Sequence, residues 1–119
     1  MLTLTPEQFA ILSLPDPHEF APQLAAEIRR DYPTFVVNMD DTALTREVER
    51  SYRHASETLR ITHLPTLVEW TQADVAWARG LRGEMNVDLS IRKSRSRNLT
   101  AQDLLSGMKA GAAWHKEDH

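Results

Sequence analysis

The chain has 119 residues, of which 41% are apolar and 26% charged, and it contains no cysteine. This length supplies one domain with a buried core, and the lack of cysteine excludes disulfides, thiol catalysis and cysteine-bound zinc. Residues 1–91 carry 8 Lys/Arg against 14 Asp/Glu, whereas residues 92–119 carry 6 against 3. An acidic body with a basic segment near one end is unlike a general nucleic-acid binder, which is usually basic overall.

Three helices are predicted in the first half of the chain. Each opens on an N-cap side chain followed by proline or a second acid, which are strong helix-start signals. These openings are Thr5 with Pro6, Asp16 with Pro17, and the pair Asp40 and Asp41, which compete as the cap of the third helix. Pro15 and Pro33 end the first two helices. The third helix carries apolar residues at helical spacing, namely Leu44, Val48, Tyr52, Ala55 and Leu59.

A fourth helix is predicted to open at residues 62–65 and to end at Gly80, since glycine is a common helix C-cap. One apolar stripe on this helix is formed by Leu64, Leu67, Val68 and Val75, and a second by Trp70 and Trp77, which lie seven residues apart. Two adjacent stripes predict a helix that is buried over a wide arc. Alternatively, the tryptophans form an exposed binding surface, because Trp is enriched in interface hot spots.

The period of the apolar pattern changes to two in the segment that follows. The alternating apolar residues are Met85, Val87, Leu89 and Ile91. This alternation is typical of a strand, and we read residues 85–91 as a strand or an extended arm. A lone strand has unpaired edges, so this segment would pair with residues 2–4 or with a strand of another chain.

Together these elements predict a mainly α protein, a single-domain bundle of four to five helices over residues 1–119. At most one short β element is expected, near residues 85–91. Residues 85–98 are predicted to form a basic, extended segment. The last helix is expected to begin at Leu99 or Thr100, and residues 115–119 to form a mobile tail.

Four cations follow the alternating segment within six residues: Arg92, Lys93, Arg95 and Arg97. Three interpretations stay open, namely contact with nucleic-acid phosphates, docking onto an acidic partner protein, and a solvated loop. No aromatic residue is interleaved for base stacking, so nucleic acid is the least favoured. In the docking interpretation the cations form an electrostatic strip, residues 85–91 add an edge to the partner's sheet, and Trp70 or Trp77 is the apolar anchor.

No catalytic constellation stands out in the sequence. Asp40 and Asp41 are interpreted as helix caps, and neither a G-x-S-x-G elbow nor a glycine-rich phosphate loop occurs. His115 and His119 have helical i,i+4 spacing, but a metal site needs three or four converging ligands. We therefore expect no enzymatic activity, no cofactor and no metal. Without a basic N-terminal region or about 20 consecutive apolar residues, the chain is expected to be a cytoplasmic, bacterial protein.

Residues 1–83 resemble a group of small bacterial proteins encoded near the spike, tip and effector genes of type VI secretion clusters. The likeness rests on the opening Leu-Thr-Leu-Thr-Pro-Glu-Gln at residues 2–8, on Phe20 in a helix that ends near Pro33, and on the helix that opens at Asp40-Asp41-Leu44 and closes at Ile61-Thr62. The chain departs from the group at Arg60, where glycine is frequent, and at residues 80–83, which only approximate a later Leu-Gly-x-x-Phe feature. These motifs are capping and core residues, so they transfer a fold and no active site.

The resemblance implies a helical accessory protein that binds a cognate effector, a toxin or a protein of the secretion apparatus, as chaperone, adaptor or immunity protein. A chaperone would cover apolar surface with the tryptophans, whereas an immunity protein would cover a toxin's active site, with the acidic face around Glu47 and Glu49. The alternatives are a DNA-binding regulator that uses residues 92–97 and a structural homodimer that pairs residues 85–91 with a second copy. Nucleic acid is an unlikely partner by this reasoning, and no membrane association is expected.

Overall fold

The computed structural model describes residues 5–117, with the side chains of residues 7, 8, 11 and 111–117 left out of the description. Over residues 5–117 the chain forms six α-helices and no strand. They are α1 (Pro6–Leu12), α2 (Pro17–Asp31), α3 (Asp41–Arg53), α4 (Leu64–Gln72), α5 (Met85–Arg92) and α6 (Arg97–Glu117). The mainly α fold class predicted from the sequence is confirmed.

The predicted cap of α2 is confirmed in atomic detail, and of the two competing acids Asp40 caps α3. Asp16 Oδ2 accepts a hydrogen bond from the Glu19 N–H at 3.1 Å. Asp40 Oδ1 accepts one from the Ala43 N–H at 2.7 Å. Each carboxylate satisfies an N–H that has no partner inside its helix, and its charge complements the helix dipole.

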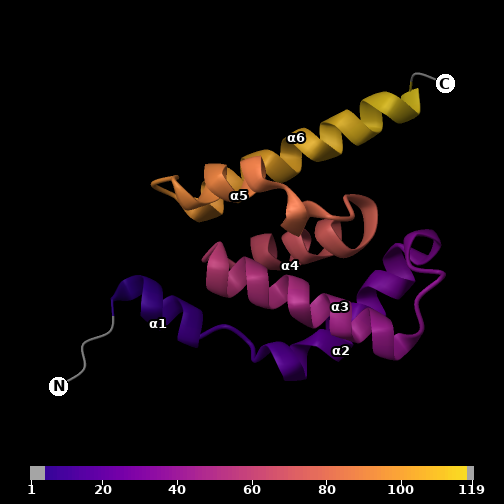
Figure 1. Ribbon diagram of the computed structural model, residues 1–119, viewed down its shortest axis with the longest axis horizontal. Helices are drawn as coiled ribbons and strands as arrows, with labels where there is room; N and C mark the ends of the chain where they lie inside the picture. Colours follow the sequence, from indigo (N-terminus) through magenta and orange to yellow (C-terminus); the bar gives the residue numbers. More distant parts are fainter. Residues whose placement is uncertain (1–4, 118–119) are drawn as a thin grey trace.

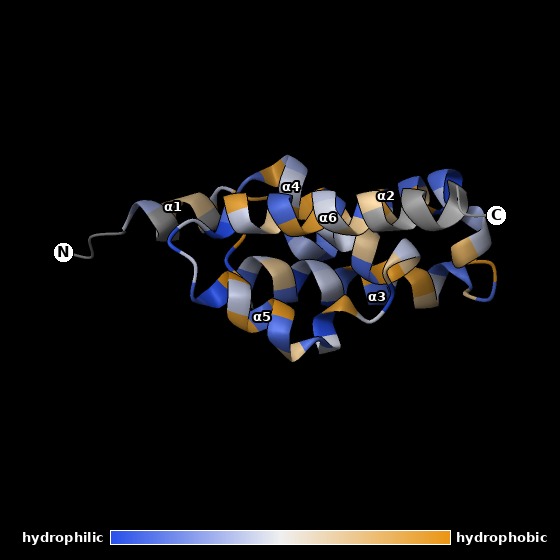
Figure 2. Cartoon of the chain, turned by 90° about the horizontal axis from the view of Figure 1, so that it is seen from above, coloured by the Kyte–Doolittle hydropathy of each residue, from blue (hydrophilic) through white to orange (hydrophobic). Residues whose placement is uncertain are grey.

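The helices stack into a slab with extents of 58 × 31 × 21 Å. α2, α3 and α4 follow one another across the slab, and α5 and α6 cover the far side of α4 (Figure 1). α1 lies at one end of the long axis in both views (Figures 1 and 2). The turn after α3 and the loop between α5 and α6 lie at the same end (Figure 1). This end is therefore where distant parts of the sequence meet.

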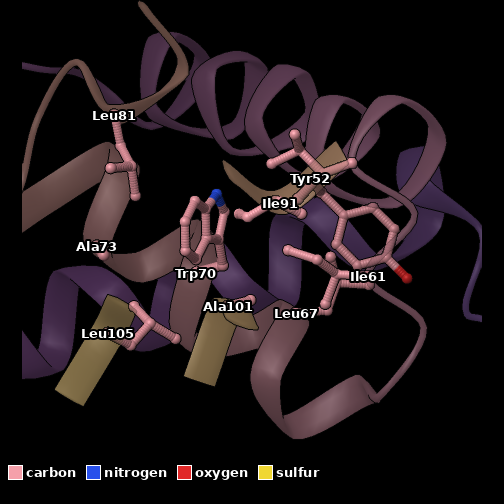
Figure 3. Close-up of a cluster of buried hydrophobic side chains, with 11 residues drawn as sticks. Tyr52, Ile61, Leu67, Trp70, Ala73, Leu81, Ile91, Ala101 and Leu105 are labelled. Carbon is pink, nitrogen blue, oxygen red and sulfur yellow. The ribbon is translucent and has the colours of Figure 1, made fainter. Parts of the chain in front are cut away.

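Two clusters of buried side chains form the core. The first surrounds Trp70, which lies in the middle of the cluster in Figure 3. Its other large members are Tyr52, Leu59, Ile61, Leu67, Leu81, Ile91 and Leu105. The second lies chiefly between α2 and α3 and is built from Leu24, Ile28, Val36, Leu44, Val48 and Val75. α3 supplies residues to both clusters and so joins the two halves of the slab.

α3 and α4 both continue into a wide turn. These turns are η2 (His54–Thr58) and η3 (Ala73–Trp77). The Leu59 N–H donates to the His54 carbonyl at 3.0 Å, and the Ala78 N–H donates to the Ala73 carbonyl at 2.7 Å. These bonds span five residues instead of four, which defines a π-helical turn.

The predicted strand or extended arm at residues 85–91 is wrong, because this segment forms helix α5. On a helix the alternating residues fall into two pairs, each separated by four positions. Val87 and Ile91 pack against the first cluster, whereas Met85 and Leu89 are exposed. A helix satisfies its own backbone groups, while a lone strand would leave both edges unpaired. The predicted extended segment at 85–98 is accordingly a helix, a short loop at 93–96 and the start of α6.

Two predictions fall wholly or partly outside the described part of the chain. Residues 2–4, the expected strand partner, precede it, and the expected mobile tail at 115–119 extends past Glu117, its last residue. Within residues 5–117, none of the helices combines the length and the apolar character that a bilayer crossing requires.

Candidate functional site

The loop between α5 and α6 is fixed by its own serines. Ser94 Oγ donates to the Ser96 carbonyl at 2.9 Å and accepts from the Ser96 N–H at 3.1 Å. Ser94 also hydrogen bonds to Thr100, and Ser96 Oγ accepts from the Leu99 N–H at 3.4 Å. Ser96 therefore caps α6, and the helix begins at Arg97, earlier than the predicted start at Leu99 or Thr100.

Asn98 attaches this loop to the entry of α4. Its Oδ1 accepts from the N–H groups of Thr62 and His63 at 2.8 and 3.1 Å. Its Nδ2 donates to Thr62 Oγ1 at 3.0 Å. One turn further along α6, Gln102 donates to Thr66 Oγ1 at 2.8 Å. Because His63 does not cap α4 with its side chain, Asn98 satisfies N–H groups at the entry of α4 from a distant part of the sequence.

A pocket of about 520 Å³ opens between this loop, the turn after α3 and helix α1. Arg60, Arg95 and Arg97 line it, together with Thr62 and Ser96. The charged residues of its described lining are these three arginines. These three segments converge at one end of the slab (Figure 1), and the pocket lies between them.

The four cations in or beside this loop, namely Arg92, Lys93, Arg95 and Arg97, are called the loop cations below. Unlike most cations of α2 and α3, they have no carboxylate partner among the described residues. Within the described residues, no carboxylate lies within 4.0 Å of Arg92, Lys93, Arg95 or Arg97. By contrast, carboxylates lie within that distance of Arg29, Arg30, Arg50 and Arg53. Most cations of the acidic body are therefore paired with carboxylates, whereas the loop presents unpaired positive charge, within the described residues, to an incoming anion.

The predicted strip of four cations divides into two parts. Arg95 and Arg97 line the pocket, whereas Arg92 and Lys93 lie outside it and are exposed. Arg97 is half-buried, and its guanidinium donates to the carbonyls of Leu59 and Arg92, each at 3.4 Å. Of the four cations, the pocket therefore contains Arg95, which is exposed, and Arg97, whose head group is already bound by main-chain carbonyls.

The apolar residues predicted for the site are only partly at the surface. Met85 is 74% exposed and Leu89 is 40% exposed. They lie one turn apart on α5, directly before Arg92. Val87 and Ile91 belong to the core, and the segment is a helix, so the predicted addition of an edge to a partner's sheet is wrong.

The tryptophans do not form an exposed stripe. Trp70 is 1% exposed and lies among Leu81, Ile91 and Leu105 (Figure 3). Trp77 is partly buried against the same cluster. The interpretation of a helix buried over a wide arc is therefore confirmed, and Trp70 is not available as a surface anchor.

The acids considered for charge mimicry are paired within the chain. Glu49 lies 3.4 Å from Arg53, and Glu47 contacts Arg82. Arg82 also bridges to buried Asp74: its Nε lies 2.7 Å from Oδ2, and its main-chain N–H donates to Oδ1 at 3.0 Å. Burial lowers the pKa of Arg82, while the neighbouring carboxylates favour its charged form. These groups hold α3 to the turn after α4 rather than forming a free acidic surface.

A second hollow, of about 570 Å³, lies between α2 and α3. Ala25, Ala26 and Leu44 form its apolar wall. Its charged residues include Arg29 and Asp41, which pair with each other at 3.1 Å. Since these charges compensate one another, this hollow has a weaker preference for a charged ligand than the pocket at the loop.

Neither a known relative nor a metal-binding cluster points to an activity for this chain. In the described residues, no group of three or more His, Asp or Glu side chains is arranged to hold a metal ion. His115 and His119 lie outside the side chains that the structure describes. No family model, curated protein or solved structure matches the chain. A functional assignment therefore rests on the residues themselves.

Sequence reasoning missed Arg60 as a site residue. Arg60 follows the wide turn η2 with a φ of +57°, in the left-handed region that glycine usually occupies after a helix. The sequence offered one signal, since the resemblance implied glycine at the position of Arg60. Arg60 adopts the left-handed conformation, and its side chain brings a cation to the pocket.

Proposed function

We propose that this protein is a non-enzymatic binding protein that holds an acidic segment of another protein against the loop between α5 and α6. The observation that carries the proposal is the group of four loop cations without a carboxylate partner in the described residues. Such a cationic strip attracts anionic partners and raises their rate of association. An acidic protein segment is therefore the partner that this surface favours.

The surface next to the loop supports a partner that has apolar residues beside its acids. Met85 and Leu89 are exposed one turn apart, and Arg92 ends the same helix. A partner helix would pack apolar side chains on Met85 and Leu89 and place its acids against the cations. This helix-to-helix contact replaces the strand pairing that the sequence pattern suggested.

The resemblance to accessory proteins of type VI secretion clusters supports a cognate effector or a secretion-apparatus protein as the partner, bound in the bacterial cytoplasm. Glu47 and Glu49 pair within the chain, so a chaperone or adaptor role has more support than an immunity role through charge mimicry. The DNA-binding alternative has less support, because the cations surround a loop instead of following one helix into a groove. The homodimer alternative loses the strand pairing on which it depended.

The test is affinity capture from the native host with tagged wild-type protein and with a charge-reversed loop variant. The variant changes Arg92, Lys93, Arg95 and Arg97 to Glu. We expect the wild type to recover one stoichiometric partner at low salt, and the variant to recover at least about tenfold less. A partner that is toxic when expressed alone would indicate immunity, and one that is unstable alone would indicate chaperoning.

A matched control reverses four cations away from the loop, so that the net charge of the two variants is equal. These cations are Arg46, Arg50, Arg53 and Lys109. The control is expected to keep the partner, and circular dichroism checks that both variants fold. Unchanged capture by the loop variant, or recovery only of nuclease-sensitive material, contradicts the proposal.

A further inference from the structure

The pocket at the loop is lined by arginines and hydroxyl groups, a combination that docking of an acidic protein segment does not require. Arg95 and Arg97 line it together with Arg60, whereas Lys93 lies outside. The cations of its described lining are therefore all arginines, whose planar heads bind oxyanions through two parallel N–H···O bonds. We propose that this pocket binds a phosphoryl group, carried by free phosphate or by a small phosphate monoester.

Two hydroxyl groups are placed to donate to such an anion. Thr62 Oγ1 accepts from Asn98 Nδ2 at 3.0 Å, and Ser96 Oγ accepts from the Leu99 N–H at 3.4 Å. Both side chains line the pocket. Each oxygen already accepts within the chain, and neither O–H has an acceptor among the described residues. No acceptor in the described part of the chain therefore competes with a ligand for either hydroxyl hydrogen.

The donors are largely held in place before a ligand arrives. The Leu59 and Arg92 carbonyls hold the Arg97 guanidinium, and Asn98 fixes Thr62 beside the loop. The hydrogen bonds of Ser94 set the shape of the loop itself. Groups that are already ordered lose less conformational entropy when an anion binds, so the pocket is preorganised.

The lining favours a phosphoryl group over other anions. The described lining has no aromatic side chain on which a base would stack. The head groups of Arg95 and Arg97 and the two hydroxyls offer more donors than the two oxygens of a carboxylate can use, whereas a phosphoryl group presents three acceptor oxygens. A volume of about 520 Å³ admits the phosphate monoester of a small alcohol.

The test uses the isolated full-length protein in a calorimeter. It is titrated with inorganic phosphate and, separately, with glycerol 3-phosphate, at constant ionic strength with sodium chloride as the reference. We expect saturable one-to-one binding with a Kd below about 10 mM. Tighter binding of glycerol 3-phosphate identifies a monoester as the ligand, and tighter binding of inorganic phosphate identifies free phosphate. Either order supports the site, and a lack of saturable binding overturns it.

Two double variants separate the pocket from the general charge of the loop. Arg95→Gln with Arg97→Gln is expected to weaken phosphate binding at least about tenfold. Arg92→Gln with Lys93→Gln removes the same charge from the same loop outside the pocket, and binding is expected to stay within about twofold. Equal weakening by the two pairs would mean diffuse attraction and would overturn the proposal.

A single variant guards against an indirect effect on folding. Arg97 also contacts the main chain, whereas Arg95 makes no hydrogen bond to another described residue. Arg95→Gln alone is expected to weaken phosphate binding several-fold while the Tm of the ligand-free protein stays unchanged. This inference goes beyond the proposed function, and it is measured without any partner protein. Its failure therefore leaves the capture experiment unaffected, and the reverse also holds.

Discussion

Tyr52 is a titratable residue inside the core. The residue is 1% exposed, and its ring packs against Phe20 with the ring centroids 5.5 Å apart. Its hydroxyl donates to the Pro15 carbonyl at 2.9 Å, which attaches the linker between α1 and α2 to the core. Burial, with a smaller contribution from the nearby Asp16 charge, raises the pKa of Tyr52 to about 12.

This raised pKa predicts a loss of stability at high pH. The unfolded chain releases the Tyr52 proton near its ordinary pKa of about 10, whereas the folded chain holds it until about pH 12. The stabilisation is therefore complete below about pH 10 and is lost as the pH rises through about 12, by about 2–3 kcal/mol in all. Denaturant unfolding between these pH values measures it. Tyr52→Phe, which cannot ionise, is the control, and an equally steep fall in that variant would refute the assignment.

At the scale of the element, two glycines predict opposite effects of the same substitution. Gly80 follows η3 with a φ of +92°, and an added Cβ would meet nothing within 4 Å. Gly80→Ala is therefore expected to destabilise the protein by about 1 kcal/mol through backbone strain alone. Gly107 lies inside α6, where an added Cβ also meets nothing within 4 Å. Gly107→Ala is expected to stabilise it by about 1 kcal/mol through helix propensity. Urea denaturation of both variants provides the measurement, and a shift of the same sign in both would be inconsistent with it.

The helix starts that depend on local chemistry were predictable from the sequence. Asp16 and Asp40 cap their helices with side chains three residues or fewer from the N–H groups that they satisfy. α5 was not predictable in this way, since Val87 and Ile91 are compatible with one face of a strand or of a helix. The choice depends on whether a partner strand lies alongside, which is a property of the whole fold.

In the candidate site, too, some residues could be predicted from local sequence and others depend on contacts between distant segments. Arg92, Lys93, Arg95 and Arg97 are contiguous enough for the sequence to mark them as a group. Arg60 joins the pocket only because α3 ends beside the loop between α5 and α6 (Figure 1). The Asn98 contacts that bring these segments together join residues 35 and 36 positions apart. No local pattern carries that information.

At the scale of the whole molecule, the two core clusters are expected to unfold together. α3 places Leu44 and Val48 in the second cluster and Tyr52 in the first. Trp70 and Trp77 pack in the first cluster, and the described second cluster holds no tryptophan. With Trp114 replaced by Phe, tryptophan fluorescence therefore reports on the first cluster, while circular dichroism reports on all of the helices.

A cavity in the second cluster tests this coupling. Leu24 is 1% exposed, and Leu24→Ala is expected to reduce the free energy of unfolding by about 2–5 kcal/mol. If the clusters are coupled, the midpoint of thermal unfolding falls equally when it is followed by fluorescence and by circular dichroism. Leu105→Ala, in the first cluster, is the matched control. A fluorescence midpoint that stays in place in the Leu24 variant would show that the halves melt independently.

The wide turns η2 and η3 fix the number of residues that the chain needs at these two positions. Each holds one residue more than an α-helical turn would over the same stretch. Deleting that residue would restore a regular helix and rotate everything after it by about 100°. After η2 the rotation would turn Arg60 away from the pocket, and after η3 it would part Arg82 from Asp74. Among descendants of this sequence, we expect substitutions within these two turns to persist and single-residue deletions to be eliminated.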